Sequence, residues 1–351
     1  MNEPLRTRIK QLTANSIYLE KQDPWPAAVH HFTVPSLWAL DMAIETGRPL
    51  LIRGEPGIGK SQIARAAAEV LKVRFLSFVV NERTERDDLL FHYDAVARLA
   101  AIQVRQSAPV SPSAEGYDGL PESLRENSFV RPGVLWWALN WKSAKRQADL
   151  FSRCCRPCPE PCPQPLTQGK SRPLCGPVVL IDEIDKADPS VPNGLLECLG
   201  TDGFRSPQLT DAVSIEDPAL RPLIILTTNE ERELPPAFLR RCLVITIAFP
   251  KAADEATRFL LDERVRPNYT AEQISVDVCH RVISELLNER AMTADRQIEG
   301  SYGPGAAEFL DIIRALVKIG EATTVKKREK EQLQALDQIQ RFALVKTLQD
   351  P

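Results

Sequence analysis

The chain has 351 residues, of which 43% are hydrophobic, and its formal net charge is -3. This length and apolar content suffice for one large domain with a smaller one beside it. Lys and Arg are mixed with Asp and Glu along the chain, so no basic block indicates a nucleic acid or an anionic membrane as partner. No apolar run is long enough to span a membrane, and the N-terminus lacks the apolar core of a signal peptide, so we expect a cytoplasmic protein.

Short apolar segments alternate with helical patterns through the first 250 residues. Strands that alternate with helices imply crossover connections and a mostly parallel sheet covered on both faces. We therefore predict an α/β fold in which helices flank a central parallel five-stranded sheet, and ligands in such sheets bind at the carboxyl ends of the strands. The five expected strands are residues 49–53, 74–80, 178–181, 223–226 and 243–248.

Four parts follow from these patterns. Residues 1–33 form an N-terminal extension and residues 34–250 the α/β domain. Residues 251–320 carry apolar positions at helical spacing, which predicts a small all-helical domain. Residues 321–351 form a charged C-terminal helix with Leu333, Leu336 and Ile339 at helical spacing, which is either exposed or docked on a partner.

A long Pro-rich section, about 106–176, interrupts the α/β domain and is expected to be an irregular insertion. Within it, residues 129–139 are apolar enough to pack as a turn and a helix, with Trp136 and Trp137 in a core. Cysteines crowd the end of this section. Zinc-ligand spacing within the group leaves two interpretations open, a metal site and a disordered loop, because a second well-separated pair is missing. The cysteines are Cys154, Cys155, Cys158 and Cys162, followed by Cys175.

The strongest motif is GEPGIGKS at residues 54–61, which matches G-x-x-x-x-G-K-[ST] between an expected strand and an expected helix. Glycines let the backbone wrap around phosphate, and the amides and helix N-terminus direct positive charge at it. Lys60 should reach the β- and γ-phosphates of a nucleotide, and the Ser61 hydroxyl should bind Mg²⁺. The residues assigned to ATP are Gly54, Glu55, Pro56, Gly57, Ile58, Gly59, Lys60, Ser61 and Gln62.

A second motif, VVLIDEID at residues 178–185, runs from a buried strand directly into two carboxylates. Asp182 is expected beside the Mg²⁺ ion, and Glu183 is placed to accept a proton from an attacking water. A water-activating glutamate favours hydrolysis of ATP over phosphoryl transfer to a metabolite.

Two further polar features follow. Asn229 ends the fourth expected strand and could hold the lytic water opposite the γ-phosphate; alternatively, it only starts a turn. Arg240 and Arg241 precede the last strand. Either could act as an arginine finger in a neighbouring subunit's site, where such cations accelerate hydrolysis by about 10³–10⁵. The alternative is a surface ion pair worth under about 1 kcal/mol.

Together these motifs resemble the MoxR-like branch of the AAA+ ATPases, a P-loop family, from about residue 34 to residue 316. The branch's own stretches have counterparts at residues 87–95, 181–189 and 233–242. The resemblance implies hexameric rings with ATP between subunits, an insertion here around 129–139 and a hairpin here about 203–214. It also makes Asn229 the first sensor and Arg241 the better finger, with Arg240 in reserve. A second-sensor arginine is missing from residues 302–309, and Arg314 would substitute poorly.

The leading hypothesis is a remodelling ATPase that acts on a protein partner, since the family's frequent partners contain a von Willebrand factor A domain. The alternative is an ATP-dependent assembly or signalling switch with slow turnover, as in conflict or defence systems. A motor on nucleic acid is disfavoured by the charge. A GTPase is disfavoured because the guanine-reading motif N-K-x-D is missing.

Overall fold

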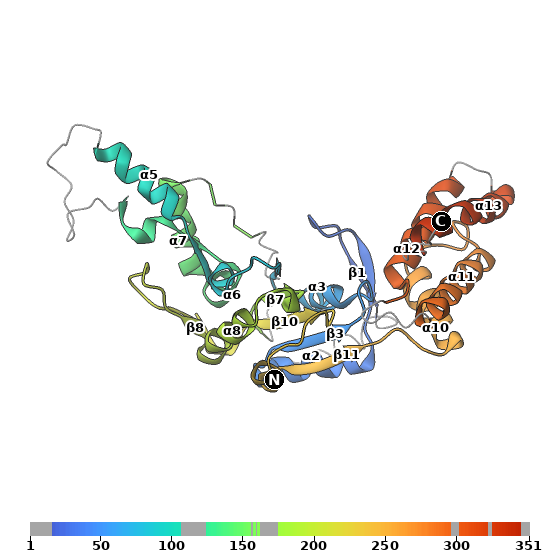
Figure 1. Cartoon of the computed structure of the whole chain (residues 1–351), viewed down its shortest axis with the longest axis horizontal. Helices are drawn as coiled ribbons and strands as arrows, with labels where there is room; N and C mark the ends of the chain where they lie inside the picture. The colour runs from blue at the N-terminus through green and yellow to red at the C-terminus, as the bar shows by residue number, and fades with distance from the viewer. Residues whose placement is uncertain are drawn as a thin grey trace.

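The computed structural model describes residues 16–106, 124–155, 157–158, 160–161, 175–295, 302–321 and 325–344. Figure 1 shows a central sheet between two outlying parts. The segment coloured teal, from the first half of the chain, lies at one end, and the orange and red C-terminal helices lie at the other. The sheet is therefore the element that joins the insertion to the helical domain.

The prediction of a central parallel five-stranded sheet is confirmed. Its order is β11 (Leu243–Ile247), β3 (Leu50–Gly54), β10 (Leu223–Thr228), β7 (Val178–Asp182) and β4 (Phe75–Val79), with every pair parallel. All residues of β10 are buried, as expected for a strand covered on both faces. The strands found are those expected from the apolar runs, shifted by at most two residues at either end.

Different helices cover the two faces of the sheet. One face packs against α2 (Val34–Thr46) and α3 (Lys60–Leu71). The other face packs against α4 (Arg86–Leu90), α6 (Val134–Leu139), α8 (Ser190–Thr201) and α9 (Pro236–Arg241). Both faces are thus apolar cores, and polar side chains are left to the ends of the strands.

The insertion is more helical than its sequence suggested. Before the insertion, α4 is followed by β5 (Phe91–Tyr93) and α5 (Ala95–Gln106). Within the insertion lie η3 (Glu126–Phe129), β6 (Val130–Pro132), α6 and α7 (Trp141–Cys154). β5 and β6 pair antiparallel. The expectation of an irregular segment was wrong for α7, whose buried face is built from Ala144, Gln147, Ala148 and Phe151. Small and polar side chains at helical spacing do not register as an apolar run.

The aromatic pair and the clustered cysteines both lie in the insertion. Trp136 and Trp137 are both buried, 4% and 3% exposed, in the core that covers one face of the sheet. Cys154 and Cys158 are free thiols. No group of three or more metal-ligating side chains lies within the residues that the structure describes, and Cys162 lies outside them. The choice between zinc and a loop therefore remains a prediction.

Between β7 and β10 the chain forms η4 (Ile184–Lys186), α8, a hairpin and η5 (Pro218–Leu220). The hairpin consists of β8 (Gly203–Phe204) and β9 (Val213–Ser214), antiparallel with Gly203 opposite Ser214. The expected hairpin at 203–214 is thereby confirmed.

The C-terminal part is helical as predicted. It contains α10 (Ala253–Leu260), the π-helix η6 (Leu261–Val265), α11 (Val276–Asp295), α12 (Ala306–Glu321) and α13 (Val325–Ala343). We call these helices the lid. Leu336 of α13 is fully buried in the lid core, and the Gln332 amide donates to the Leu316 carbonyl at 3.1 Å. The terminal helix α13 thus packs on the other helices of the lid. None of the helices in the described ranges has the length and apolarity needed to cross a bilayer.

The N-terminal extension contains a hairpin of β1 (Ser16–Leu19) and β2 (Ala28–His31). Residues 1–15 of the extension lie outside the described residues. Arg65 of α3 donates to the Pro26 carbonyl at 2.6 Å and also to the Glu20 carbonyl, which ties the hairpin to the helix that follows the glycine loop. His30 is buried beside Arg264 of the lid, and burial, helped by that cation, lowers its pKa to about 3. The ring is therefore neutral near pH 7.

Candidate functional site

The loop 54–61 joins the end of β3 to the start of α3 and takes a shape that side chains would oppose. Gly54 has a φ of 151° and Gly57 a φ of 74°. A Cβ on Gly54 would lie 2.1 Å from the Ile247 carbonyl oxygen of the neighbouring strand. Glycine is therefore required for the tight passage beside β11. The loop ends at the N-terminus of α3, where free amide groups favour an anion.

Lys60, the first residue of α3, is buried and its ammonium is bound by three oxygens. Nζ donates to the Gly54 carbonyl at 2.7 Å, to the Glu55 carbonyl at 2.9 Å and to Asn229 Oδ1 at 2.6 Å. Burial lowers the pKa of Lys60, and nearby carboxylates, Asp182 first, oppose that change. All three acceptors are neutral, so phosphate oxygens could replace one of them with a gain in charge attraction.

Ser61 and Asp182 meet beside the lysine. The Ser61 hydroxyl lies 2.9 Å from both Asp182 carboxylate oxygens, and the Thr227 hydroxyl donates to one of them. A hydroxyl and a carboxylate are the hard oxygen ligands that Mg²⁺ prefers. The residues present therefore fit a magnesium ion that bridges the loop and the end of β7.

Glu183 turns away from the strand because its backbone is left-handed, with a φ of 59°. Its amide donates to the Thr227 hydroxyl at 2.9 Å. Its two carboxylate oxygens accept from Asn229 Nδ2 at 3.2 Å and from Lys186 Nζ at 2.7 Å. A non-glycine residue in this region is strained, and such strain gathers at functional sites. The turn places the carboxylate beside Asn229, whose oxygen binds Lys60.

These side chains line one cleft. It is lined by Pro56, Gly57, Gly59, Lys60, Ser61 and Gln62 from the loop and α3, and by Asp182, Glu183, Thr227 and Asn229 from the strand ends. Three assigned residues do not line it. Gly54 lies at the strand end, Ile58 is buried in the lid core, and Glu55 directs its carboxylate to Arg290. Arg314 of α12 does line the cleft, where it pairs with Asp311 at 2.8 Å.

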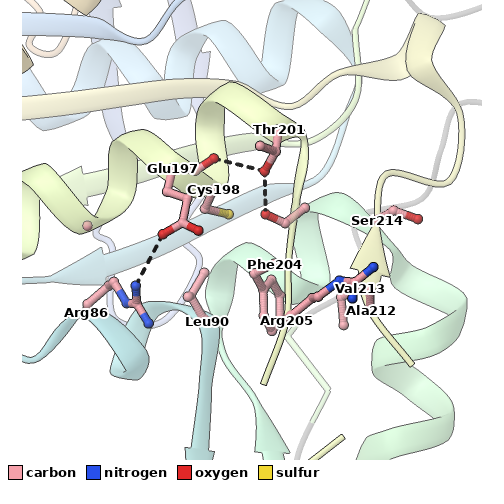
Figure 2. A pocket seen from close by; sticks show the side chains of 12 residues that line it. Arg86, Leu90, Glu197, Cys198, Thr201, Phe204, Arg205, Ala212, Val213 and Ser214 are labelled. Atoms are coloured by element: carbon pink, nitrogen blue, oxygen red, sulfur yellow. Dashed lines mark hydrogen bonds and ion pairs between the residues drawn. The ribbon is translucent and has the colours of Figure 1, made fainter. Parts of the chain in front are cut away.

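A second cleft of similar size lies between α4, α8 and the β8–β9 hairpin (Figure 2). The two volumes, about 360 and 350 Å³, do not separate the candidates. Chemistry does. The second cleft combines an Arg86–Glu197 pair at 3.6 Å with the apolar side chains of Leu90, Phe204 and Val213. It has no glycine loop at a helix N-terminus, so it lacks the features that bind a polyphosphate.

Arg240 and Arg241 lie far from the first cleft. They end α9, just before β11, and in the register of the sheet Leu243 pairs with Leu50 while Ile247 pairs with Gly54. The arginines are therefore at the amino end of the strands and the glycine loop is at the carboxyl end. Both side chains are exposed, and within the described part of the chain their guanidinium groups have no ion-pair partner. Arg48 binds the backbone carbonyls of both residues instead.

Sequence reasoning missed three contributors. Thr227 binds both Asp182 and the Glu183 amide, and its signal was the pair of threonines that ends an apolar buried strand. Lys186 binds Glu183 three residues along the same turn. Arg290 binds Glu55 across 235 residues of sequence, and no local pattern could have linked them.

Part of the chain is similar to a known protein family. A family model described as an AAA domain (dynein-related subfamily) matches residues 49–117. Over that segment the chain is similar to an AAA domain. The matched segment holds the glycine loop and α3 and ends before Asp182.

Two other comparisons, with solved structures and with curated proteins, add nothing to this similarity. A crystal structure described as a "putative ATPase" from Cytophaga hutchinsonii aligns over 97% of this chain and 84% of its own, with 12% identity and a TM-score of 0.37. At these values the similarity bears on neither activity nor partners. No curated protein matches the chain.

Proposed function

We propose that the AAA domain binds ATP with Mg²⁺ and hydrolyses it to ADP and phosphate. The observation that carries this proposal is the connected set of hydrogen bonds from Lys60 through Asn229 to Glu183, beside the Ser61–Asp182 contact, in one cleft. Phosphoryl transfer needs mainly positioning and charge stabilisation, and this set supplies both.

Each side chain has a role that follows from its position. The loop amides and Lys60 hold the β- and γ-phosphates, while Ser61 and Asp182 are placed to hold magnesium, which would neutralise charge on the phosphates. Glu183 accepts the proton of the attacking water. Asn229, which contacts both Lys60 and Glu183, orients that water between phosphate and base.

The chain acts, in this proposal, as one subunit of a hexameric MoxR-like ring. Two facts support an assembly. The arginines at 240–241 are exposed and unpaired within the described residues, and they lie at the end of the sheet opposite the chain's own cleft. A cation so placed is out of reach of its own cleft and could reach the cleft of another copy. Arg241 is the proposed finger and Arg240 the reserve.

The work of the ring is the remodelling of a protein partner, for which a protein with a von Willebrand factor A domain is the candidate. One observation favours the second candidate, a slow assembly switch. One oxygen of Glu183 is bound by Lys186 at 2.7 Å, so the ammonium competes with a water proton for this carboxylate. The two candidates share the site and differ in turnover rate, which steady-state ATPase measurements separate.

The proposal is tested with Lys60→Ala. We expect ATP affinity to fall by about 100-fold, equivalent to about 2.8 kcal/mol, because the variant loses the buried cation at the loop. Isothermal titration calorimetry with ATP and Mg²⁺ measures it.

Lys72→Ala is the matched control. Lys72 caps the far end of the same helix, where it pairs with Glu69, and its loss should leave ATP affinity unchanged. Equal affinity of Lys60→Ala and wild type would remove the assignment of the phosphate site.

A further inference from the structure

Arg290 of α11 joins the lid to the glycine loop. Nη2 donates to both carboxylate oxygens of Glu55, at 2.9 and 3.1 Å. Nη1 donates to the Pro304 carbonyl at 3.0 Å, in the segment that leads into α12. The guanidinium carbon also lies 4.0 Å from the centre of the Phe249 ring, just after β11. One side chain thus contacts three separate segments.

Glu55 transmits this contact to the phosphate site. Its carboxylate binds Arg290 of the lid, and its backbone carbonyl accepts from Lys60 Nζ at 2.9 Å. A single loop residue therefore lies between the lid arginine and the lysine proposed to bind phosphate. Movement of the lid that breaks the ion pair frees the loop residue that holds Lys60.

The Arg290–Glu55 pair is unusually shielded for an ion pair of this chain. The two side chains are only 20% and 21% exposed, whereas Arg281 and Glu285 on the same helix pair at 2.8 Å with 55% and 23% exposure. Exposed pairs contribute little because water and salt screen them. The shielded pair, with its ring contact and carbonyl partners, can hold the lid and the glycine loop in one relative position.

Other lid contacts with the loop are weaker or apolar. Arg264 donates to the Ile58 carbonyl at 3.3 Å. Nearby, the Tyr302 hydroxyl, in the segment before α12, donates to the Asn229 carbonyl after β10 at 3.4 Å. A Cβ on Gly57 would lie 2.7 Å from the Ala307 Cβ, so α12 rests directly against the loop. These contacts bring the lid close, and the ion pair supplies the charged connection.

We propose that Arg290 is a positioning residue that, through Glu55, keeps the lid closed on the loop and thereby slows nucleotide release. The inference rests on the proposed binding of ATP in this cleft. It assigns to Arg290 and Glu55 the coupling between lid position and Lys60, in a lid whose cleft-lining Arg314 is engaged by Asp311.

The test is a double-mutant cycle of Arg290→Gln, Glu55→Gln and the double variant, with the dissociation rate of fluorescently labelled ADP from the full chain as readout. Each single change should raise that rate about tenfold, a usual size for coupling between sites. The double variant should match Arg290→Gln, because both changes remove one interaction. Arg290→Lys keeps the charge and loses the two-sided contact, so its rate should lie between.

Arg281→Gln is the matched control, and it should release ADP at the wild-type rate. A purely structural role of Arg290 would lower the melting temperature and leave the dissociation rate unchanged. That result, or single effects that multiply in the double variant, would overturn the inference. Failure of the wild type to bind nucleotide would overturn both proposals, whereas binding with unaltered release from Arg290→Gln would overturn this one alone.

Discussion

The two ends of the central sheet carry opposite kinds of polar surface. At the carboxyl end, Lys60, Ser61, Asp182 and Asn229 are bonded to one another and partly or fully buried. At the amino end, Arg240 and Arg241 are exposed and have no acidic partner within the described residues. One end forms a connected site from a single chain, and the other presents cations that no carboxylate of the described residues pairs with.

The two ends of the sheet therefore predict different requirements for nucleotide binding and for ATP hydrolysis. In the proposed account, every side chain assigned to the nucleotide comes from one chain, so ATP affinity should be a property of the monomer. The cation that would stabilise the transferring phosphoryl group is at the wrong end of the sheet, so fast hydrolysis should require a neighbour. Substitutions at one end of the sheet at a time test this difference.

The largest effect is expected from Arg241→Ala. Turnover of the assembled protein should fall by about 10³-fold or more, the usual effect of an arginine finger, with ATP affinity of the monomer unchanged. ATPase assays over a range of protein concentrations measure it. Arg240→Ala is the matched control and should have a small effect.

Mixing experiments show whether the finger acts between chains. Glu183→Gln subunits still carry Arg241, so adding them to Arg241→Ala subunits should restore part of the activity. If Arg240→Ala abolishes turnover while Arg241→Ala does not, the finger assignment is wrong.

A smaller loss, about 10²–10⁴-fold in turnover, is expected from Glu183→Gln, because the amide cannot accept the proton of water. ATP affinity should stay near the wild-type value, since Glu183 contacts Asn229 and Lys186 and does not touch the loop lysine. Single-turnover hydrolysis measures it. Glu230→Gln, which alters a half-exposed neighbour paired with Arg53, should keep wild-type turnover. Wild-type rates in Glu183→Gln would reassign the base.

The sheet could be predicted because its strands are mostly apolar runs, and three of them, β3, β7 and β10, lead into glycine, acid or amide. The same endings placed Lys60, Ser61, Asp182, Glu183 and Asn229 at one edge, since carboxyl ends of parallel strands coincide. Their convergence in the cleft follows that rule.

The missed features depend on contacts that no local pattern encodes. Three of the four buried residues of α7 are Ala or Gln, which give only a weak apolar pattern, although Asn140 caps the helix by accepting from the Ser143 amide. The partner of Glu55 lies in α11, and the pairing depends on how the lid packs on the loop. The left-handed backbone of Glu183 is likewise imposed by its surroundings.

The central claim, that a triphosphate and its metal share the Lys60–Ser61–Asp182 cleft, is tested most directly by a crystal structure of Glu183→Gln with ATP and Mg²⁺. We expect Lys60 Nζ to exchange Asn229 for a phosphate oxygen and the metal to lie about 2.1 Å from Ser61 Oγ, within one water of Asp182. Nucleotide bound elsewhere on the chain, or a metal that contacts neither Ser61 nor the surroundings of Asp182, would contradict the account.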